Sequence, residues 1–139
     1  MTIKQLSIFI ENKGGTLIKV LDLLSKANIQ IIASTIADTK DYGIYRVLCN
    51  NPSQAYTILK DAGINVQLAD VIALSIDDEP GRAANAIKTL SDNGISILYM
   101  YSFLWRSKGV LVFRADPAEK AKETIMLNKL TFLTEADFA

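Results

Sequence analysis

The stretch DDEPGRAANAIKTLSDNGISI, residues 77–97, decides the fold, because it contains a turn, a helix, a helix stop and a strand in succession. An acidic turn precedes Pro80 and Gly81, and proline suits the first position of a helix, where no intrahelical N–H bond is lost. Apolar residues then recur at the spacing of one buried helix face, and Gly94 suits the left-handed residue that ends a helix. The helix therefore begins with free backbone N–H groups, which favour an anion such as a carboxylate.

The same unit occurs earlier, at residues 11–31, where ENKGGT leads into a helical run, an asparagine and a strand. An offset of 66 residues aligns the two copies without a gap. It matches Gly15 with Gly81, Leu21 with Ile87, Leu24 with Leu90, Ile31 with Ile97, and Gly43 with Gly109. We therefore interpret the chain as two copies of one module, residues 1–69 and residues 70–139.

Each copy predicts the element order βαββαβ. In the first copy, strands are expected at 3–10, 29–37, 42–49 and 64–68, with helices at 15–27 and from Pro52 to a stop at Gly63. In the second copy, strands are expected at 71–76, 95–105, 109–115 and 130–133, with helices at 83–93 and 117–126 and a tail from Glu135. This order is typical of an α+β, ferredoxin-like fold, an antiparallel sheet with both helices on one face.

The strand at 95–105 is apolar on both of its faces. Strict alternation places Leu98, Met100 and Leu104 on one face, and the other face then holds Ile95, Ile97, Tyr99, Tyr101, Phe103 and Trp105. We expect the aromatic face to be covered by the sister module or by a second chain. The alternative is a local core with a few exposed aromatic residues.

The composition narrows the classes of function. Of 139 residues, 50% are apolar and 22% are charged, which indicates a folded globular chain. Fifteen basic residues balance fifteen acidic ones, which argues against binding to nucleic acid or to an anionic membrane. The sequence has no recognisable signal peptide or long apolar stretch, so we expect a cytoplasmic protein. Cys49 is the single cysteine, which excludes an internal disulfide.

Histidine is absent from the sequence. Its absence removes the commonest general base, the Ser-His and Cys-His nucleophile pairs, and most zinc sites. No convergent carboxylate pair is evident either. We therefore expect no catalytic residue, no metal site and no cofactor.

The repeated loop, helix and strand unit resembles the ACT domain, a small-molecule-sensing module found on amino-acid biosynthetic enzymes. The whole chain is similar to stand-alone tandem ACT proteins. The family pattern is an acidic or Asn residue, then Pro-Gly, one variable residue and a Leu that opens the helix. The second copy departs from it at Ala83, and the first departs from it at Gly14, where the family has proline; the residues that match are Asn12, Gly15, Leu17, Asp78, Pro80 and Gly81.

The resemblance implies that a free amino acid binds between the loop of one module and the second strand of its neighbour. The implied site residues are Asn12, Gly14, Gly15, Thr16 and Leu17 in the first loop, Asp78, Glu79, Pro80, Gly81, Arg82 and Ala83 in the second, and Ser34 and Met100 on the facing strands. Backbone amides would hold the α-carboxylate, and Asn12 or Asp78 would hold the α-ammonium. Because Pro80 stiffens its loop, we expect the second site to be the better formed.

The resemblance also implies a regulatory, allosteric protein that forms a homodimer and controls a biosynthetic enzyme. One alternative is a pure protein–protein interaction module without a small-molecule ligand. RNA recognition on this fold needs aromatic residues where this chain has Val110 and Val112. Acyl-phosphate hydrolysis would need an arginine-rich loop at residues 11–15, which this sequence does not supply.

Overall fold

The computed structural model describes residues 1–11, 15–38 and 42–139, and it forms two compact units. The unit that we call the N-terminal module comprises Lys4–Ala69 with Phe138–Ala139. The unit that we call the C-terminal module comprises Asp70–Asp137 with Met1–Ile3. Within these residues the chain has six strands and four α-helices, in the order that the two copies predict. None of the helices described is long and apolar enough to cross a membrane.

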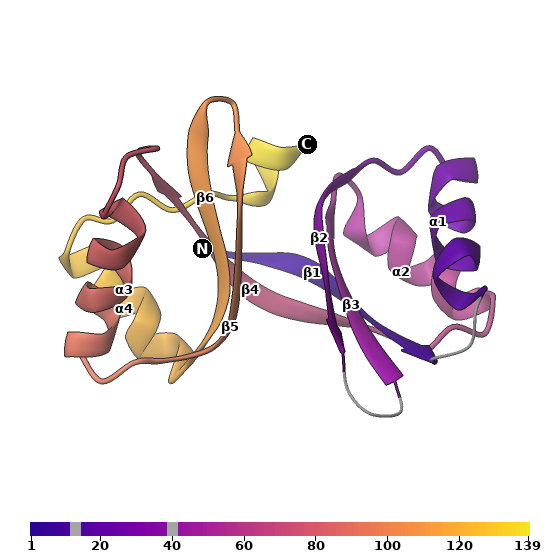
Figure 1. Ribbon diagram of the computed structural model, residues 1–139, viewed down its shortest axis with the longest axis horizontal. Coiled ribbons are helices and arrows are strands. Elements are labelled where there is room, and N and C mark those ends of the chain that lie inside the picture. The colour runs from indigo at the N-terminus through magenta and orange to yellow at the C-terminus, as the bar shows by residue number, and fades with distance from the viewer. Residues whose placement is uncertain (12–14, 39–41) are drawn as a thin grey trace. The chain divides into compact units, whose positions relative to one another are not determined.

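The N-terminal module is a sheet with two helices on one side (Figure 1). Its strands lie in the order β2-β3-β1-β4, and β3 pairs antiparallel with both β1 and β2. Leu6, Ile8 and Val47 of the sheet pack with Val20, Leu24 and Leu59 of the helices in its core. The elements are β1 (Thr2–Glu11), α1 (Thr16–Lys26), β2 (Ile31–Asp38), β3 (Tyr42–Cys49), α2 (Pro52–Asp61) and the first part of β4 (Val66–Ile76).

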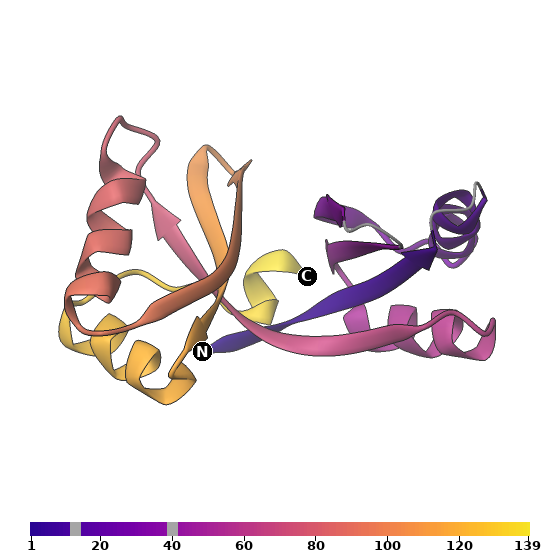
Figure 2. The ribbon, with the colours of Figure 1, turned by 60° about the horizontal axis from the view of Figure 1, so that its bottom comes forward.

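The C-terminal module repeats this layout, with strands in the order β4-β6-β5 and both helices on one side of them (Figure 2). Its buried core contains Ile72, Leu74, Leu90, Leu111, Phe113 and Ile125. Beyond β4 its elements are α3 (Arg82–Asp92), β5 (Ser96–Trp105), β6 (Lys108–Asp116), α4 (Ala118–Leu127) and a 3-10 helix, η1 (Glu135–Phe138).

The helix boundaries follow the 66-residue repeat. Helices α1 and α3 begin at residues 16 and 82, and α2 and α4 begin at residues 52 and 118. Each helix is followed by a residue with positive φ, at Asn28, Gly63, Gly94 and Lys129, which are again pairwise 66 residues apart. A left-handed residue is the common way to end a helix. The predicted stops at Gly63 and Gly94 are therefore confirmed.

The edge strand β5 contains a bulge that the sequence pattern does not reveal. Ile97 pairs with Ala115, a residue of the core beneath the helices, but the next pair joins Tyr99 to Arg114. An extra residue shifts the alternation of side chains by one position. Ile97 therefore lies on the helix side, whereas the aromatic residues from Tyr99 to Trp105 lie on the opposite face, so the predicted single face from Ile95 to Trp105 is wrong. Strand β2 has the same irregularity between residues 31 and 33, again 66 residues earlier.

The structure also differs from the prediction at several element ends. The strands expected at 64–68 and 71–76 are one continuous strand, β4. The strand expected at 130–133 is reduced to a single bridge between Leu74 and Phe132. The expected tail is the 3-10 helix η1, whose Phe138 is buried. Pro80 precedes the helix instead of opening it, because Gly81 is the N-cap of α3.

Candidate functional site

Two exposed ion pairs organise the loop before α3. The carboxylate of Asp77 accepts a hydrogen bond of 2.8 Å from Nζ of Lys108, which arrives from β6. Oε2 of Glu79 accepts a hydrogen bond of 3.2 Å from Nε of Arg82 and lies 3.1 Å from Nη2 of the same side chain. These pairs hold the two ends of the loop, and Gly81 between them takes a left-handed conformation with φ 87°.

The pair of Asp77 and Lys108 shifts the pKa of both groups. The hydrogen bond from Lys108, and then its positive charge, lower the pKa of the Asp77 carboxyl below its ordinary value. The same hydrogen bond and the charge of Asp77 raise the pKa of the Lys108 ammonium. Both shifts favour the charged forms, so this end of the loop carries a closed ion pair at neutral pH.

Among the described residues, no side chain caps the helices that follow the two candidate loops. In α3 the first intrahelical bond runs from Asn85 N to Gly81 O, at 3.0 Å, and in α1 the equivalent bond joins Lys19 N to Gly15 O, at 2.9 Å. The amides of residues 83–84 and 17–18 precede those bonds and have no intrahelical acceptor. Helix α2 differs, because the side chain of Asn51 accepts a hydrogen bond from Gln54 N. The loops of α1 and α3 thus keep donors available.

The predicted loop residues play different parts. Asn12 and Gly14 lie outside the described residues, whereas Gly15 is exposed, is the N-cap of α1 and has φ 109°. Thr16 is half-buried, and the side chains of Leu17 and Ala83 pack against the two cores, so they can offer a ligand only their backbone. The remaining members of the second loop, Asp78, Glu79, Pro80, Gly81 and Arg82, are exposed. Within the described part of the chain, the Asp78 carboxylate has no hydrogen bond or ion pair.

The strand positions Ser34 and Met100 lie on the helix side of the edge strands. Ser34 pairs with Val47, and its Oγ accepts a hydrogen bond of 3.0 Å from the hydroxyl of Tyr45. Met100 pairs with Phe113 and is 46% exposed. The two positions are 66 residues apart, and both residues are exposed.

A loop and a strand position of the same module are too far apart to form one site. In the C-terminal module, the last residue of β4, Ile76, pairs with Gly109, and Gly109 pairs with Leu104 of β5. Met100 therefore lies two strand spacings, about 10 Å, across the sheet and four residues, about 13 Å, along it from Ile76. The end of β4 that leads into the loop and the strand position Met100 are therefore not adjacent in the sheet.

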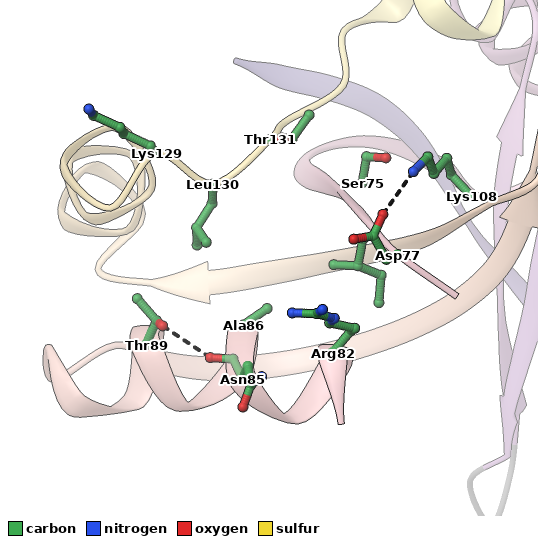
Figure 3. A pocket seen from close by; sticks show the side chains of 11 residues that line it. Ser75, Asp77, Arg82, Asn85, Ala86, Thr89, Lys108, Lys129, Leu130 and Thr131 are labelled. Atoms are coloured by element: carbon green, nitrogen blue, oxygen red, sulfur yellow. Dashed lines mark hydrogen bonds and ion pairs between the residues drawn. The ribbon is translucent and has the colours of Figure 1, made fainter. Parts of the chain in front are cut away.

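A groove of about 500 Å³ lies beside the second loop and was not predicted from the sequence (Figure 3). It includes Asp77 and Arg82 but none of residues 78–81, nor Met100. Three of its polar residues, Arg82, Asn85 and Thr89, lie on one side of α3 at the i, i+3, i+7 spacing, which was the signal available in the sequence. The other lining residues are Ser75, Ile76, Ala86, Lys108, Lys129, Leu130 and Thr131.

Two further observations concern reactive chemistry. The described residues contain no group of three or more Cys, Asp or Glu side chains that could hold a metal ion. The thiol of Cys49 is buried at the end of β3, and burial raises its pKa, while a hydrogen bond from the backbone of Asn51 opposes that rise.

Comparison with known proteins gives a family and several related structures. A family model described as an ACT domain pair matches residues 1–139. The crystal structure of protein BT0572 from Bacteroides thetaiotaomicron is 38% identical and covers 99% of this chain and 96% of that chain, with a TM-score of 0.93. No curated protein matches the sequence.

More distant structures share the fold. The regulatory subunit of aspartate kinase from Thermus thermophilus, in a ligand-free form, is 14% identical, with a TM-score of 0.62 over 89% of this chain and 91% of that chain. The corresponding subunit from Thermus flavus is 15% identical, with a TM-score of 0.57 over 89% and 90% of the two chains. At these identities the likeness shows the fold alone.

Proposed function

This chain belongs to the family of ACT domain pairs, and from that membership we propose that it is a regulatory protein without catalytic activity that binds a free amino acid. The ligand would bind between the loop of one module and the edge strand of another. The absence of histidine from the sequence supports the lack of catalysis, because it removes the commonest general base.

The observation that carries the proposal is the helix start behind a left-handed glycine, at Gly15 and at Gly81, which no side chain of the described residues caps. Such a start presents backbone N–H groups and the positive end of the helix dipole to an anion. It contributes roughly 0.3–2 kcal/mol, whereas micromolar affinity requires about 8 kcal/mol. Most of the affinity must therefore come from enclosure, for which the exposed positions Ser34 and Met100 on the edge strands are suited.

The second loop offers groups for both ends of an amino acid. The amides of residues 83–84 would hold the α-carboxylate, and the carboxylate of Asp78 would hold the α-ammonium. Glu79 and Arg82 neutralise each other across the loop, so they would meet a polar side chain of the ligand. The first loop would offer Asn12, Gly14, Gly15 and the amides from Thr16 onward, without a proline to stiffen it.

Assembly and partner follow from the same arrangement. A loop and a strand from different modules must meet, and a homodimer would supply the second module for each open edge strand. The apolar side chains Leu98, Met100 and Leu104, which are 46–65% exposed on β5, would be covered in that dimer. The regulatory subunits of aspartate kinase share this fold, which supports a biosynthetic enzyme as the regulated partner.

Isothermal titration calorimetry of the full chain against a panel of free amino acids tests the proposal. We expect one amino acid to bind, and both its N-acetylated form and its decarboxylated amine to bind at least about tenfold more weakly, since each loses a charge-assisted hydrogen bond. Asp78→Asn should weaken binding similarly, whereas the control Asp92→Asn, at the other end of α3, should not. Binding that ignores both modifications would contradict the site.

A second candidate function is a pure protein–protein interaction module. The exposed apolar side chains of β5 favour it, because an edge strand with such residues is a ready surface for another chain. Sedimentation analysis with and without the amino-acid panel separates the two. Self-association that Met100→Glu abolishes, together with no heat from any amino acid, would favour this alternative.

A further inference from the structure

The groove beside α3 has the shape and chemistry of a separate small-molecule site. Its volume of about 500 Å³ falls within the usual range for such sites. Its apolar surface comes from Ile76, Leu130 and Ala86, which belong to or pack against the module core. Figure 3 shows the side chain of Leu130 directed into the groove opposite α3. The apolar portion of a ligand could pack against this surface.

An arginine side chain lies at one end of the groove. Figure 3 shows the guanidinium of Arg82 directed into the groove, while the ammonium of Lys129 points away from it. Among the lining residues the single acid is Asp77, and Lys108 already neutralises it at 2.8 Å. Arg82 contacts Glu79 through Nε and Nη2, and within the described residues its Nη1 makes no hydrogen bond or ion pair. Both partners of that pair are about half exposed, so the pair is weak and exchangeable.

The N-terminal module has different side chains at two of the equivalent positions. At the position of Asn85 it has Lys19, whose Nζ donates a hydrogen bond of 3.4 Å to the carbonyl of Ala62, just after α2. At the position of Thr89 it has Leu23, which packs against the core. In the C-terminal module the shorter Asn85 does not make this bridge, and the hydroxyl of Thr89 turns back to the carbonyl of Asn85 at 3.0 Å. Two of the side chains that line the groove are thus not repeated in the N-terminal module.

We propose that this groove binds a small organic molecule with an oxyanion at one end and a branched apolar body. The oxyanion would lie against the guanidinium of Arg82, and the body would lie on Leu130, Ala86 and Ile76. Asn85, Thr89, Ser75 and Thr131 supply the remaining hydrogen bonds. This site shares Arg82 with the proposed amino-acid site, but it uses none of residues 78–81, so the Asp78 carboxylate takes no part in it.

The test is a titration of the ¹⁵N-labelled full chain, followed by NMR chemical shifts, with 4-methylpentanoate as the carboxylate probe. Its neutral counterpart is 4-methylpentan-1-ol, the phosphate arm is 3-methylbutyl phosphate, and inorganic phosphate tests the head group alone. We expect saturable shifts at the amides of residues 85–89 and 129–131. The carboxylate or the phosphate ester should bind at least about tenfold more tightly than the alcohol, because only they make charge-assisted bonds to Arg82.

Two variants assign the shifts to the groove. Asn85→Glu places a negative charge in it at an exposed position and should reduce binding of the better anion at least about tenfold, whereas Asn85→Gln should retain it. Thr89→Leu introduces the residue that the N-terminal module has at the equivalent position. It should weaken binding, while the NMR spectrum remains that of the folded chain. Asp78→Asn should leave this binding unchanged, which separates it from the amino-acid site. Equal affinity for the alcohol, shifts that do not saturate, or unaltered binding in both Asn85→Glu and Thr89→Leu would overturn the proposal.

Discussion

In the N-terminal module, the region between the start of the first helix and the end of the second is bridged by Lys19, whereas the C-terminal module has Asn85 there and an open groove. The loops before the first helix of each module also differ. The second loop is held by two ion pairs and contains Pro80, while the first has Gly14 and Gly15 in the sequence. The cores, in contrast, place equivalent residues at equivalent positions. The two modules therefore match in their cores and differ in the loops and at the groove positions 85 and 89.

The largest expected effect on stability concerns the equivalent core leucines of the two modules. Leu24 and Leu90 are 66 residues apart and 1% and 0% exposed. Leu24→Ala and Leu90→Ala should each lower the free energy of unfolding by about 2–5 kcal/mol, because each leaves a cavity in a core. Urea denaturation measures both changes, with Ser25→Ala and Ser91→Ala as exposed controls on the same helices. A large cost in one module and almost none in the other would show that the cores are not equivalent.

The helix-start glycines test whether the loops are equivalent in backbone as well. Gly15 and Gly81 have φ of 109° and 87°, a conformation that is costly for a β-branched residue. Gly81→Val should lower the free energy of unfolding by about 1–2 kcal/mol, and Gly81→Asn should cost less, since asparagine tolerates this region. Gly15→Val and Gly15→Asn should lower the free energy of unfolding by amounts similar to those of the corresponding changes at Gly81.

The affinity for the amino acid then distinguishes backbone strain at these glycines from the loss of a contact with the ligand. If our assignment of the better site is right, Gly81→Val weakens binding more than Gly15→Val does. Calorimetry at a temperature where all variants are folded provides the measurement. Equal affinities in the wild type, Gly81→Val and Gly15→Val would contradict a ligand site at either loop.

Much of the fold could be predicted because the signals are local. The spacing of apolar residues, Pro52 and the glycines at 63 and 94 were enough to place helices whose boundaries the structure confirms to within a residue or two. Asn28 and Lys129 take the same left-handed conformation without being glycine. The 66-residue repeat predicts that these two residues end helices, because each is equivalent to a glycine, but their residue types alone do not.

The features that could not be predicted depend on strand pairing and on contacts distant in sequence. The bulge in β5 leaves alternation intact on each side of Leu98, so only the register with β6 shows that Ile97 and Tyr99 lie on opposite faces. The 3-10 helix η1 depends on Trp105, whose Nε1 donates a hydrogen bond of 3.2 Å to the carbonyl of Asp137. The groove requires residues from three separate segments, and that juxtaposition is not apparent from any single motif.

The buried cysteine gives a smaller test of the equivalence of the cores. Cys49 and Ala115 occupy equivalent positions, and both are buried. Cys49→Ala should therefore cost only about 1 kcal/mol, since it removes one small apolar group. Because burial raises the pKa of the thiol, we also expect iodoacetamide to alkylate the native protein far more slowly than the urea-unfolded chain. Fast alkylation of the folded protein would show that the end of β3 opens readily.

The smallest expected effect concerns the ion pair that distinguishes the second loop. Lys108 binds Asp77, whereas the equivalent residues of the N-terminal module are Tyr42 and Glu11, which cannot form such a pair. The pKa of Asp77 is lowered in the folded protein, so its contribution to stability is present above the ordinary pKa of aspartate and is lost as the pH falls through the folded value. The pKa of Lys108 is raised, so its contribution is lost only as the pH rises through that folded value.

Lys108→Met should return the pKa of Asp77 toward the ordinary value of about 3.9, because the hydrogen bond and the charge that lower it are both removed. Titration of the side-chain carboxyl carbon by ¹³C NMR measures the pKa directly, and the stability at neutral pH should change little, since the pair is exposed. Lys88→Met is the matched control, because Lys88 forms a similar exposed pair with Asp92 near the far end of α3. If Asp77 titrates identically in the wild type and Lys108→Met, the ion pair does not organise this loop in solution, and the difference between the two loops reduces to their glycines and Pro80.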